Sequence, residues 1–494
     1  MTQGKVNRRQ RHEGLDMVVD LSDRDLITIE DLSNEEIEGV FVLADEMGQA
    51  LRKQAQLCEG MIMASLFFEP STRTRLSFEA AMHRLGGRVI SVAEMGNTSL
   101  AKGESIADMA RVVGSYADII VIRHPWEGAA KVVADYADVP VINAGDGGHE
   151  HPSQTLCDLY TIKKERGTLQ GLKIALWGDL KYGRTVHSLS YALARFGAII
   201  HFRPSPGFEM PEHVTRKLTT EYSGRLDRYD GTKDTREEGL FPLDAIYVTP
   251  SGPHQLANIP AVGFQVEMEK DVDALYVTRI QKERFDTERG AQDSEEFPVV
   301  DRRLLKGKRF AETIIMHPLP RVDELAYDID QDPRSMYFKQ AARGVPIRMA
   351  LIALLLGAKK VKAGAQPASG APARSYPLYR RDTGLRCQNR VCVSVQKTET
   401  RYIRPEFQIV SADPLTLRCL YCEHEIHPQY VASAKWHQGL IENKRYYRAD
   451  TAMLRRIQPE NLIIFDSESI ARAQGFKPGK KAQRVKGSEG GAQT

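Results

Sequence analysis

Clusters of polar residues follow apolar stretches of this sequence, and their side chains are suited to holding anions. The first is FFEPSTRTR, in which Ser71, Thr72 and Thr74 offer hydroxyl donors and Arg73 offers a planar guanidinium that fits phosphate. The segment lies where an apolar strand gives way to a helix, and the N–H groups at a helix N-terminus attract anions. A capped surface helix is the alternative. Arginine in the first turn would then oppose the helix dipole, so an anion site is favoured.

Five further clusters occupy the same place, just after a predicted strand. They are Arg123–Pro125 (RHP), His151–Gln154 (HPSQ), Arg184, Arg279 and His317–Arg321 (HPLPR). In open α/β sheets, ligands bind beyond the carboxyl ends of the strands, so these clusters should converge. Any single cluster could be a structural loop, but together they predict one site. The chain has no Walker A loop and no convincing GxGxxG fingerprint, so the anion is expected to be small.

Four of the six cysteines form two close pairs, Cys387-x4-Cys392 and Cys419-x2-Cys422. Four thiolates suit a closed tetrahedral zinc site that organises a domain too small for its own core. His424 and His427 are second-choice ligands, and four unbonded cysteines are the plain alternative. We expect one structural Zn²⁺ per chain and no organic cofactor.

The first 360 residues read as alternating short apolar strands and helices. The candidate strands are Met61–Phe68, Asp118–Arg123, Val139–Asn143, Lys173–Trp177, Ala274–Val277 and Thr313–Met316. This order is typical of parallel sheets with helices on both faces. The predicted fold is α/β, with two doubly wound parallel-sheet domains, an interdomain cleft and a small C-terminal zinc-binding domain.

Composition marks an Ala/Gly/Pro/Ser-rich linker (361–379) and a disordered tail (471–494). The other expected parts are an N-terminal arm (1–20), a first α/β domain (21–165), a second (166–335), a C-terminal helix expected to pack back on the first (336–360) and the zinc-binding domain (380–470).

Overall composition excludes several classes of protein. With 494 residues, 42% hydrophobic and 27% charged, the chain has an ordinary globular composition. The longest apolar run, Met349 to Ala358, is shorter than the ~20 residues of a membrane span, so no membrane partner is expected. A net charge of +3 does not predict a nucleic-acid partner. The N-terminus shows no secretory signal, which favours a reducing, cytoplasmic compartment, where clustered cysteines suggest metal before disulfide.

Seven motifs together resemble the catalytic chains of the aspartate carbamoyltransferase family. In chain order they are FFEPSTRTRLSFE, NTSLAKGES, RHP, HPSQTLCDLYT, GDLKYGRTVHSL, TRIQKERF and MHPLPRVDEL. STRT is shared by all carbamoyltransferases, whereas HPLPR with the TRxQ arginine points to aspartate as the acceptor. The resemblance implies synthesis of N-carbamoyl-L-aspartate, the second step of pyrimidine biosynthesis, by direct amine attack through a tetrahedral intermediate.

The resemblance also implies roles for the carbamoyl phosphate residues. The phosphate would be bound by Ser71, Thr72, Arg73, Thr74 and Arg123. The carbamoyl carbonyl would be polarised in an oxyanion site by Thr74, Arg123 and His151. Gln154 would hold the carbamoyl NH2. Ser99 and Lys102, in the segment Asn97–Ser105, resemble residues that enter the neighbouring subunit's site, so at least a homotrimer with shared sites is implied.

The same resemblance implies that a second set of residues binds aspartate. Arg184 would bind its α-carboxylate, and Arg279, assisted by Gln281, its β-carboxylate. Leu319 and Pro320 would offer backbone carbonyls to the amine and the carbamoyl nitrogen, and the mobile charge of Lys102 would serve both substrates.

The cysteine pattern and CLYCE resemble the zinc domain of the family's regulatory chain, which docks on the catalytic chain. Zinc modules could then join trimers into a larger assembly. The regulatory chain's nucleotide-binding domain has no counterpart, so control by ATP or CTP is not predicted. Two rivals stay open: a carbamoyltransferase for another amino acid, and a zinc scaffold without catalysis.

Overall fold

The computed structural model describes most of the chain. The described residues are 17–50, 54–93, 102–222, 225–228, 243–249, 272–279, 299–306, 310–322, 324–363, 376–435, 444–449, 454 and 457–479. Only the backbone is described at Met17, Arg184, 225–228 and Pro459. Ser99 and Gln281 lie outside these ranges, as does much of the stretch between the strands of the second domain.

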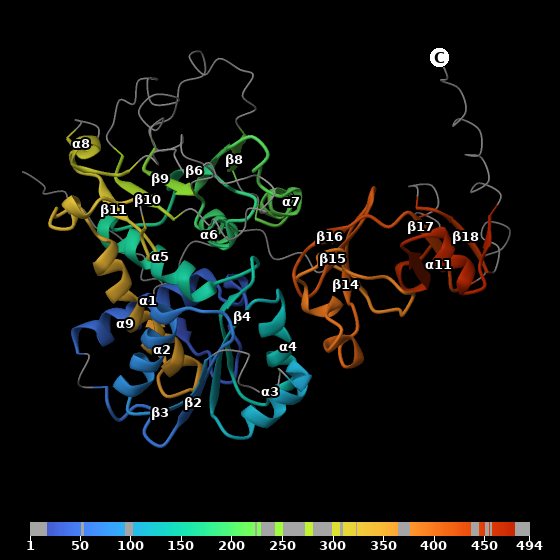
Figure 1. Ribbon diagram of the computed structural model, residues 1–494, viewed down its shortest axis with the longest axis horizontal. Coiled ribbons are helices and arrows are strands. Elements are labelled where there is room, and N and C mark those ends of the chain that lie inside the picture. The colour runs from blue at the N-terminus through green and yellow to red at the C-terminus, as the bar shows by residue number, and fades with distance from the viewer. Residues whose placement is uncertain are drawn as a thin grey trace, which may run out of the picture.

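The first domain is built on a four-stranded parallel sheet of order β3-β2-β4-β5 (Figure 1). Its strands are β2 (Ile62–Phe67), β3 (Arg88–Ala93), β4 (Ile119–His124) and β5 (Val141–Asp146). Strands β4 and β5 are buried along their whole length, which explains the apolar residues IIVI and VI with which they begin. The sequence did not reveal β3, because this edge strand has no buried residue and its exposed and half-buried residues do not alternate regularly.

Helices connect and cover this sheet. They are α1 (Asn34–Gln49), α2 (Thr72–Arg84), α3 (Ile106–Gly114), α4 (Ala129–Tyr136) and α5 (Pro152–Arg166). Local chemistry sets where several begin: Ser33 and Glu36 form a capping box at α1, and Ser105 caps α3. Helices α2 and α5 begin differently, without a side-chain cap, and both open into the candidate site.

The second domain holds a six-stranded parallel sheet of order β11-β10-β9-β6-β7-β8. Its strands are β6 (Lys173–Gly178), β7 (Ile199–Pro204), β8 (Arg225–Arg228), β9 (Ala245–Thr249), β10 (Ala274–Val277) and β11 (Ile314–Met316). Its helices are α6 (Arg184–Arg195), α7 (Glu212–Glu221) and α8 (Arg302–Leu305). Two parallel sheets with flanking helices confirm the predicted fold class. Strands β7, β8 and β9 were missing from the predicted set.

Helix α9 (Tyr337–Leu355) returns the chain from the second domain to the first and packs against α1, α2 and α5. Strand β12 (Val361–Ala363) then pairs antiparallel with β1 (Met17–Val19). The expected arm and linker boundaries are therefore wrong at these ends, because residues 17–19 and 361–363 form a sheet. Backbone pairing gives both segments a structure that their composition did not indicate.

The C-terminal region contains two small sheets. The first has the order β13-β14-β15-β16 and consists of β13 (Leu378–Tyr379), β14 (Phe407–Ala412), β15 (Leu415–Cys419) and β16 (Glu425–Ile426). The second has the order β19-β17-β18-β20, from β17 (Tyr430–Ser433), β18 (Arg445–Arg448), β19 (Leu462–Phe465) and β20 (Lys477–Pro478), with helix α11 (Glu468–Ala473). The expected linker end at 379 and tail start at 471 are corrected, because β13, the end of α11 and β20 belong to this region.

The first of these sheets, with its cysteines, contacts the first domain beside α3 and α4 (Figure 1). The backbone of Glu127 donates to Val391 at 3.0 Å and accepts from Val393 at 2.9 Å, and its carboxylate accepts from Asn389 at 2.5 Å. The Glu399 carboxylate accepts from the backbone N–H of Ile106, at the start of α3. The module is thus docked through backbone and side-chain hydrogen bonds.

The same module also reaches the second domain through α7. Lys217 is 3% exposed, and its ammonium pairs with Glu30 of the first domain and, at 2.6 Å, with Glu423 beside the last cysteine. Arg418 of β15 pairs with Glu221 of α7 at 2.9 Å. Burial lowers the pKa of Lys217, but the two carboxylates outweigh it and hold that pKa well above its usual value. One buried cation therefore joins three modules.

Among the helices in the described part of the chain, none is long and apolar enough to cross a membrane.

Candidate active site

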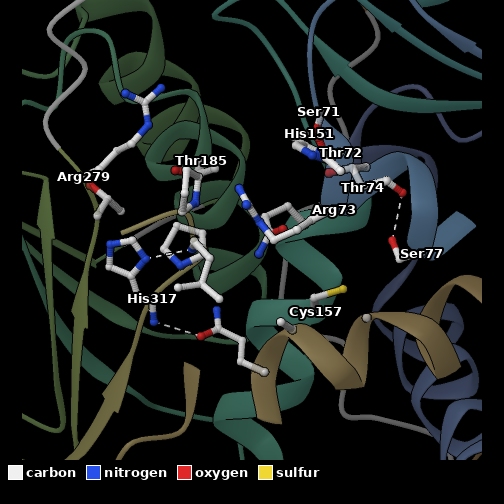
Figure 2. Close-up of a pocket in the computed structure, with 18 of the residues that line it drawn as sticks. Ser71, Thr72, Arg73, Thr74, Ser77, His151, Cys157, Thr185, Arg279 and His317 are labelled. Carbon is white, nitrogen blue, oxygen red and sulfur yellow. Dashed lines mark hydrogen bonds between the residues drawn. The ribbon is translucent and has the colours of Figure 1, made fainter. Parts of the chain in front are cut away.

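A cavity of about 710 Å³ lies where the two α/β domains meet (Figure 2). The residues that line it include ten of those singled out from the sequence, namely Ser71, Thr72, Arg73, Thr74, Arg123, His151, Gln154, Arg279, Leu319 and Pro320. They come from segments more than 200 residues apart. The carboxyl ends of strands in both sheets meet here, as the sheet topology predicts.

Helix N-termini supply much of the cavity wall. Helix α2 begins at Thr72 and α5 at Pro152, and neither has a hydrogen bond from a capping side chain. Helix α6 begins at Arg184 in the same uncapped way, with Gly183 and Thr185 lining the cavity. The unpaired N–H groups and the positive end of each helix dipole favour a negatively charged ligand.

Arg123 is buried at the end of β4 and is held firmly in place. Its guanidinium donates to Glu69 at 2.8 Å and to the backbone carbonyl of Ala144 at 3.1 Å. Gly145 has φ +120°, and a Cβ there would lie 2.9 Å from the Arg123 guanidinium. Glycine at this position therefore leaves room for Arg123 beside His151.

Arg73 and Arg279 line the cavity from the two different domains. Arg73 extends from the α2 side toward the wall that carries Arg279 and His317 (Figure 2). Burial and, second, the charge of Arg279 lower the pKa of Arg73. Like charges brought together in a partly buried cavity are stabilised when an anion lies between them. The electrostatics thus match the chemistry expected from the sequence.

The loop after β11 has a defined hydrogen-bonding pattern. His317 Nδ1 accepts from the Leu319 N–H at 2.8 Å, so Nε2 carries the proton that it donates to Glu324 at 2.8 Å. Burial lowers the pKa of His317 although Glu324 opposes that shift, which favours the neutral ring. The neutral tautomer fixes the backbone that carries the carbonyls of Leu319 and Pro320.

Four sequence candidates are not among the described lining residues. Lys102 is exposed, just before α3, and is not among the residues that line the cavity. The backbone of Arg184 starts α6, whereas its side chain falls outside the description, as do Ser99 and Gln281. Only part of the expected aspartate set can therefore be located.

Sequence reasoning missed several residues that line the cavity. Thr249 is the last residue of β9 and Thr278 directly follows β10, so the strand-end rule could have found them. Gln340 and Arg348 lie on α9, far along the chain and among apolar neighbours, where no local pattern marks them. Glu69 stood within the FFEPSTRTR motif without a role, and it is the ion-pair partner of Arg123.

The four cysteines of the C-terminal module gather in one buried cluster. Their sulfur atoms all lie within 4.8 Å of one another, with 3.5 Å between those of Cys387 and Cys422 and 3.8 Å between those of Cys392 and Cys419. Zn–S bonds of about 2.3 Å in a tetrahedron place sulfurs about 3.8 Å apart. The donor set and spacing fit structural zinc, with no place for a substrate. Among described residues, neither His424 nor His427 joins the cluster.

Comparison with known proteins agrees with this geometry. Residues 24–164 match the family "Aspartate/ornithine carbamoyltransferase, carbamoyl-P binding domain", and residues 263–355 match its "Asp/Orn binding domain". Residues 382–432 match the "Aspartate carbamoyltransferase regulatory chain, metal binding domain". The second C-terminal sheet lies almost wholly beyond that last match.

Individual relatives cover the whole catalytic region. Aspartate carbamoyltransferase catalytic subunits from Thermococcus gammatolerans and Methanocaldococcus jannaschii are 45% and 44% identical over 345 and 334 residues, which are 69% and 67% of this chain and 99% and 97% of theirs.

Solved structures show the same likeness. The M. jannaschii catalytic subunit has 41% identity and a TM-score of 0.53, covering 68% of this chain and 100% of its own. The Trypanosoma cruzi aspartate transcarbamoylase in complex with carbamoyl phosphate and aspartate has 34% identity and a TM-score of 0.54, with 68% and 98% coverage. The chain belongs to the aspartate carbamoyltransferase family, and it joins a catalytic region to a zinc domain of the regulatory-chain type.

Proposed function

We propose that this chain transfers the carbamoyl group of carbamoyl phosphate to the α-amino group of L-aspartate, releasing N-carbamoyl-L-aspartate and phosphate for pyrimidine synthesis. The observation that carries the proposal is the cavity between the two domains. There, uncapped helix N-termini and the Arg73, Arg123 and Arg279 guanidiniums surround one polar space. Two anionic substrates need this arrangement.

The first-domain wall would take carbamoyl phosphate. Ser71, Thr72, Arg73 and Thr74 bind the phosphate at the start of α2. Arg123 and His151, with Thr74, donate to the carbonyl oxygen, where negative charge develops in the tetrahedral intermediate. Donors already fixed by burial, as Arg123 is by Glu69 and Ala144, need little reorganisation during the reaction.

Aspartate would enter from the second-domain wall. Arg279 and Gln281 hold its β-carboxylate, and Arg184 its α-carboxylate. The carbonyls of Leu319 and Pro320 accept hydrogen bonds from the amine and the carbamoyl nitrogen, which aims the neutral amine at the carbonyl carbon. The intermediate then expels phosphate, which carries away the amine's proton. Positioning and electrostatics supply the rate.

The proposal includes an assembly of at least three chains. Lys102 is exposed and is not among the lining residues of its own cavity, which supports a role in the neighbouring subunit's site together with Ser99. Active sites shared between subunits imply a homotrimer or a higher assembly of trimers. None of the six cysteines forms a disulfide, which favours a reducing, cytoplasmic compartment.

Mixing inactive variants tests the shared site. Lys102→Ala and Arg123→Ala chains should each be nearly inactive alone. After dissociation and reassembly together, some sites would combine an intact Lys102 with an intact Arg123, and activity should return. Remixed Arg123→Ala chains alone serve as the control. No recovery in demonstrated mixed oligomers would contradict the sharing.

The acceptor assignment has its own test. Wild-type protein should use L-aspartate in preference to L-ornithine and L-asparagine. Arg279→Ala should lose aspartate use, by about 100-fold or more in kcat/KM, because a carboxylate loses its charge-assisted hydrogen bonds. Its affinity for carbamoyl phosphate should change little. Normal aspartate kinetics in this variant would reject the assignment of Arg279.

A further inference from the structure

Asp158 is a buried carboxylate next to the cavity that has no part in the proposed chemistry. It lies on α5, one turn after Gln154, and is 1% exposed. Three donors converge on its Oδ1 atom: the Gln154 amide at 2.8 Å, the Gln340 amide at 2.9 Å and the Tyr276 hydroxyl at 3.1 Å. These donors come from α5, α9 and β10, so one oxygen atom joins both domains and the returning helix.

The direction of these hydrogen bonds follows from a single backbone group. The N–H of His317 donates to Gln340 Oε1 at 3.0 Å. A backbone N–H can only donate, so the NH2 end of Gln340 must face Asp158. Asp158 Oδ1 is therefore an acceptor, and Gln154 must present its own NH2 end to it. Gln154 lines the cavity, and with its NH2 end on Asp158 its carbonyl oxygen is the side-chain group that it can offer to a ligand as an acceptor.

We propose that Asp158, held by Gln340, is a positioning residue that fixes the Gln154 amide with its oxygen toward the amino group of carbamoyl phosphate, so that the site selects a carbamoyl phosphate over an acyl phosphate. The inference rests on the proposed function, because Gln154 is there the group that holds the carbamoyl NH2. It adds the reason why that amide accepts rather than donates.

The selectivity has a simple chemical basis. Acetyl phosphate carries a methyl group where carbamoyl phosphate carries NH2, and the two differ little in size. A fixed amide oxygen gains a hydrogen bond from NH2 and is left unpaired against methyl, which costs binding energy. An amide free to rotate could turn its own NH2 toward the ligand, where two donors would meet. Loss of Asp158 should therefore weaken the preference.

Substitutions at Asp158 separate positioning from fold. Asp158→Leu removes the acceptor while keeping a similar shape. Asp158→Asn keeps a carbonyl oxygen for the three donors and cannot ionise, so it should rescue the function. Gln340→Met removes the amide that holds Asp158 and leaves Asp158 itself intact. This variant tests the positioning role if Asp158→Leu does not fold. Gln154→Met removes the selective oxygen itself.

The measurement is the ratio of the acetyl phosphate inhibition constant to the carbamoyl phosphate KM, in the full-length zinc-loaded oligomer. We expect the ratio to fall about tenfold in Asp158→Leu, Gln340→Met and Gln154→Met, which is the worth of about one hydrogen bond, and to stay near wild type in Asp158→Asn. The Asp158→Leu/Gln154→Met double variant should show no further loss.

A purely structural role would weaken both ligands together and leave the ratio unchanged. An unchanged ratio in folded Asp158→Leu or Gln340→Met would overturn the inference, as would a full loss in Asp158→Asn. The proposed function fails in a different way, because wild-type protein would then form no carbamoyl aspartate at all.

Discussion

The interdomain cavity and the zinc site both gather residues from distant parts of the chain, but different forces hold them. In the cavity, side chains follow buried strands, and two packed sheets fix their positions. In the zinc module the sheets are small, and the four thiols gather in one buried cluster with metal-ligand spacing. Large α/β domains can thus position polar groups by packing and hydrogen bonding without a metal, whereas the small module depends on its metal.

Removing zinc should have the largest effect, and it should unfold the zinc module without unfolding the cavity domains. Structural zinc contributes on the order of 10 kcal/mol to the folding of such modules, so chelation should unfold the region after residue 376. The cavity domains should keep their cooperative unfolding. Metal analysis measures the loss of zinc, and far-UV circular dichroism with limited proteolysis shows which region unfolds.

A cysteine outside the cluster gives the control. Cys58 is buried in the first domain, and Cys58→Ala should leave the zinc content at one per chain, whereas Cys419→Ala should lower it. A metal-free chain with an intact, protease-resistant C-terminal module would contradict the assignment of structural zinc.

The junction between the two regions should show the next largest effect. Lys217→Met leaves Glu30 and Glu423 buried without their cation, which should cost about 3–5 kcal/mol of unfolding free energy. Lys131→Met is the matched control, because its pair with Asp135 is exposed and worth at most about 1 kcal/mol. Denaturant unfolding measures the unfolding free energy of both variants. Equally small losses of unfolding free energy in Lys217→Met and Lys131→Met would show that this network does not join the modules.

Within the cavity, loss of one oxyanion donor should leave the fold and slow the reaction. Arg123→Ala or His151→Ala should lower turnover on the order of 100-fold or more, equivalent to about 2.7 kcal/mol of transition-state stabilisation. Zinc content and the thermal midpoint of the C-terminal module should not change. Turnover within a few-fold of wild type would remove the residue from the oxyanion site.

The sequence predicted the strand ends that carry the first-domain wall, because β4 and β5 begin with apolar residues and end in polar ones. A search for apolar runs does not find β3, which is an exposed edge strand. Strand β9, which ends at Thr249, was also not predicted. Gln340 and Arg348 reach the cavity only because α9 folds back on the first domain. A long-range contact of this kind leaves no local pattern in the chain.

The C-terminal region shows a similar limit. The cysteine spacing predicted the zinc cluster, since metal ligation restricts residue type and interval. The second sheet was not predicted, because strands such as β18, with the sequence RYYR, lack the alternation of apolar and polar residues that marks a strand. The strand boundaries of this sheet therefore could not be predicted from the sequence.

The most direct test of the account is product formation from carbon-13-labelled carbamoyl phosphate and L-aspartate, followed by nuclear magnetic resonance. We predict labelled N-carbamoyl-L-aspartate and an equal amount of phosphate from the zinc-loaded oligomer, and at least about 100-fold slower formation by Arg123→Ala. Release of phosphate without labelled carbamoyl aspartate, or product at an equal rate from Arg123→Ala, would contradict it.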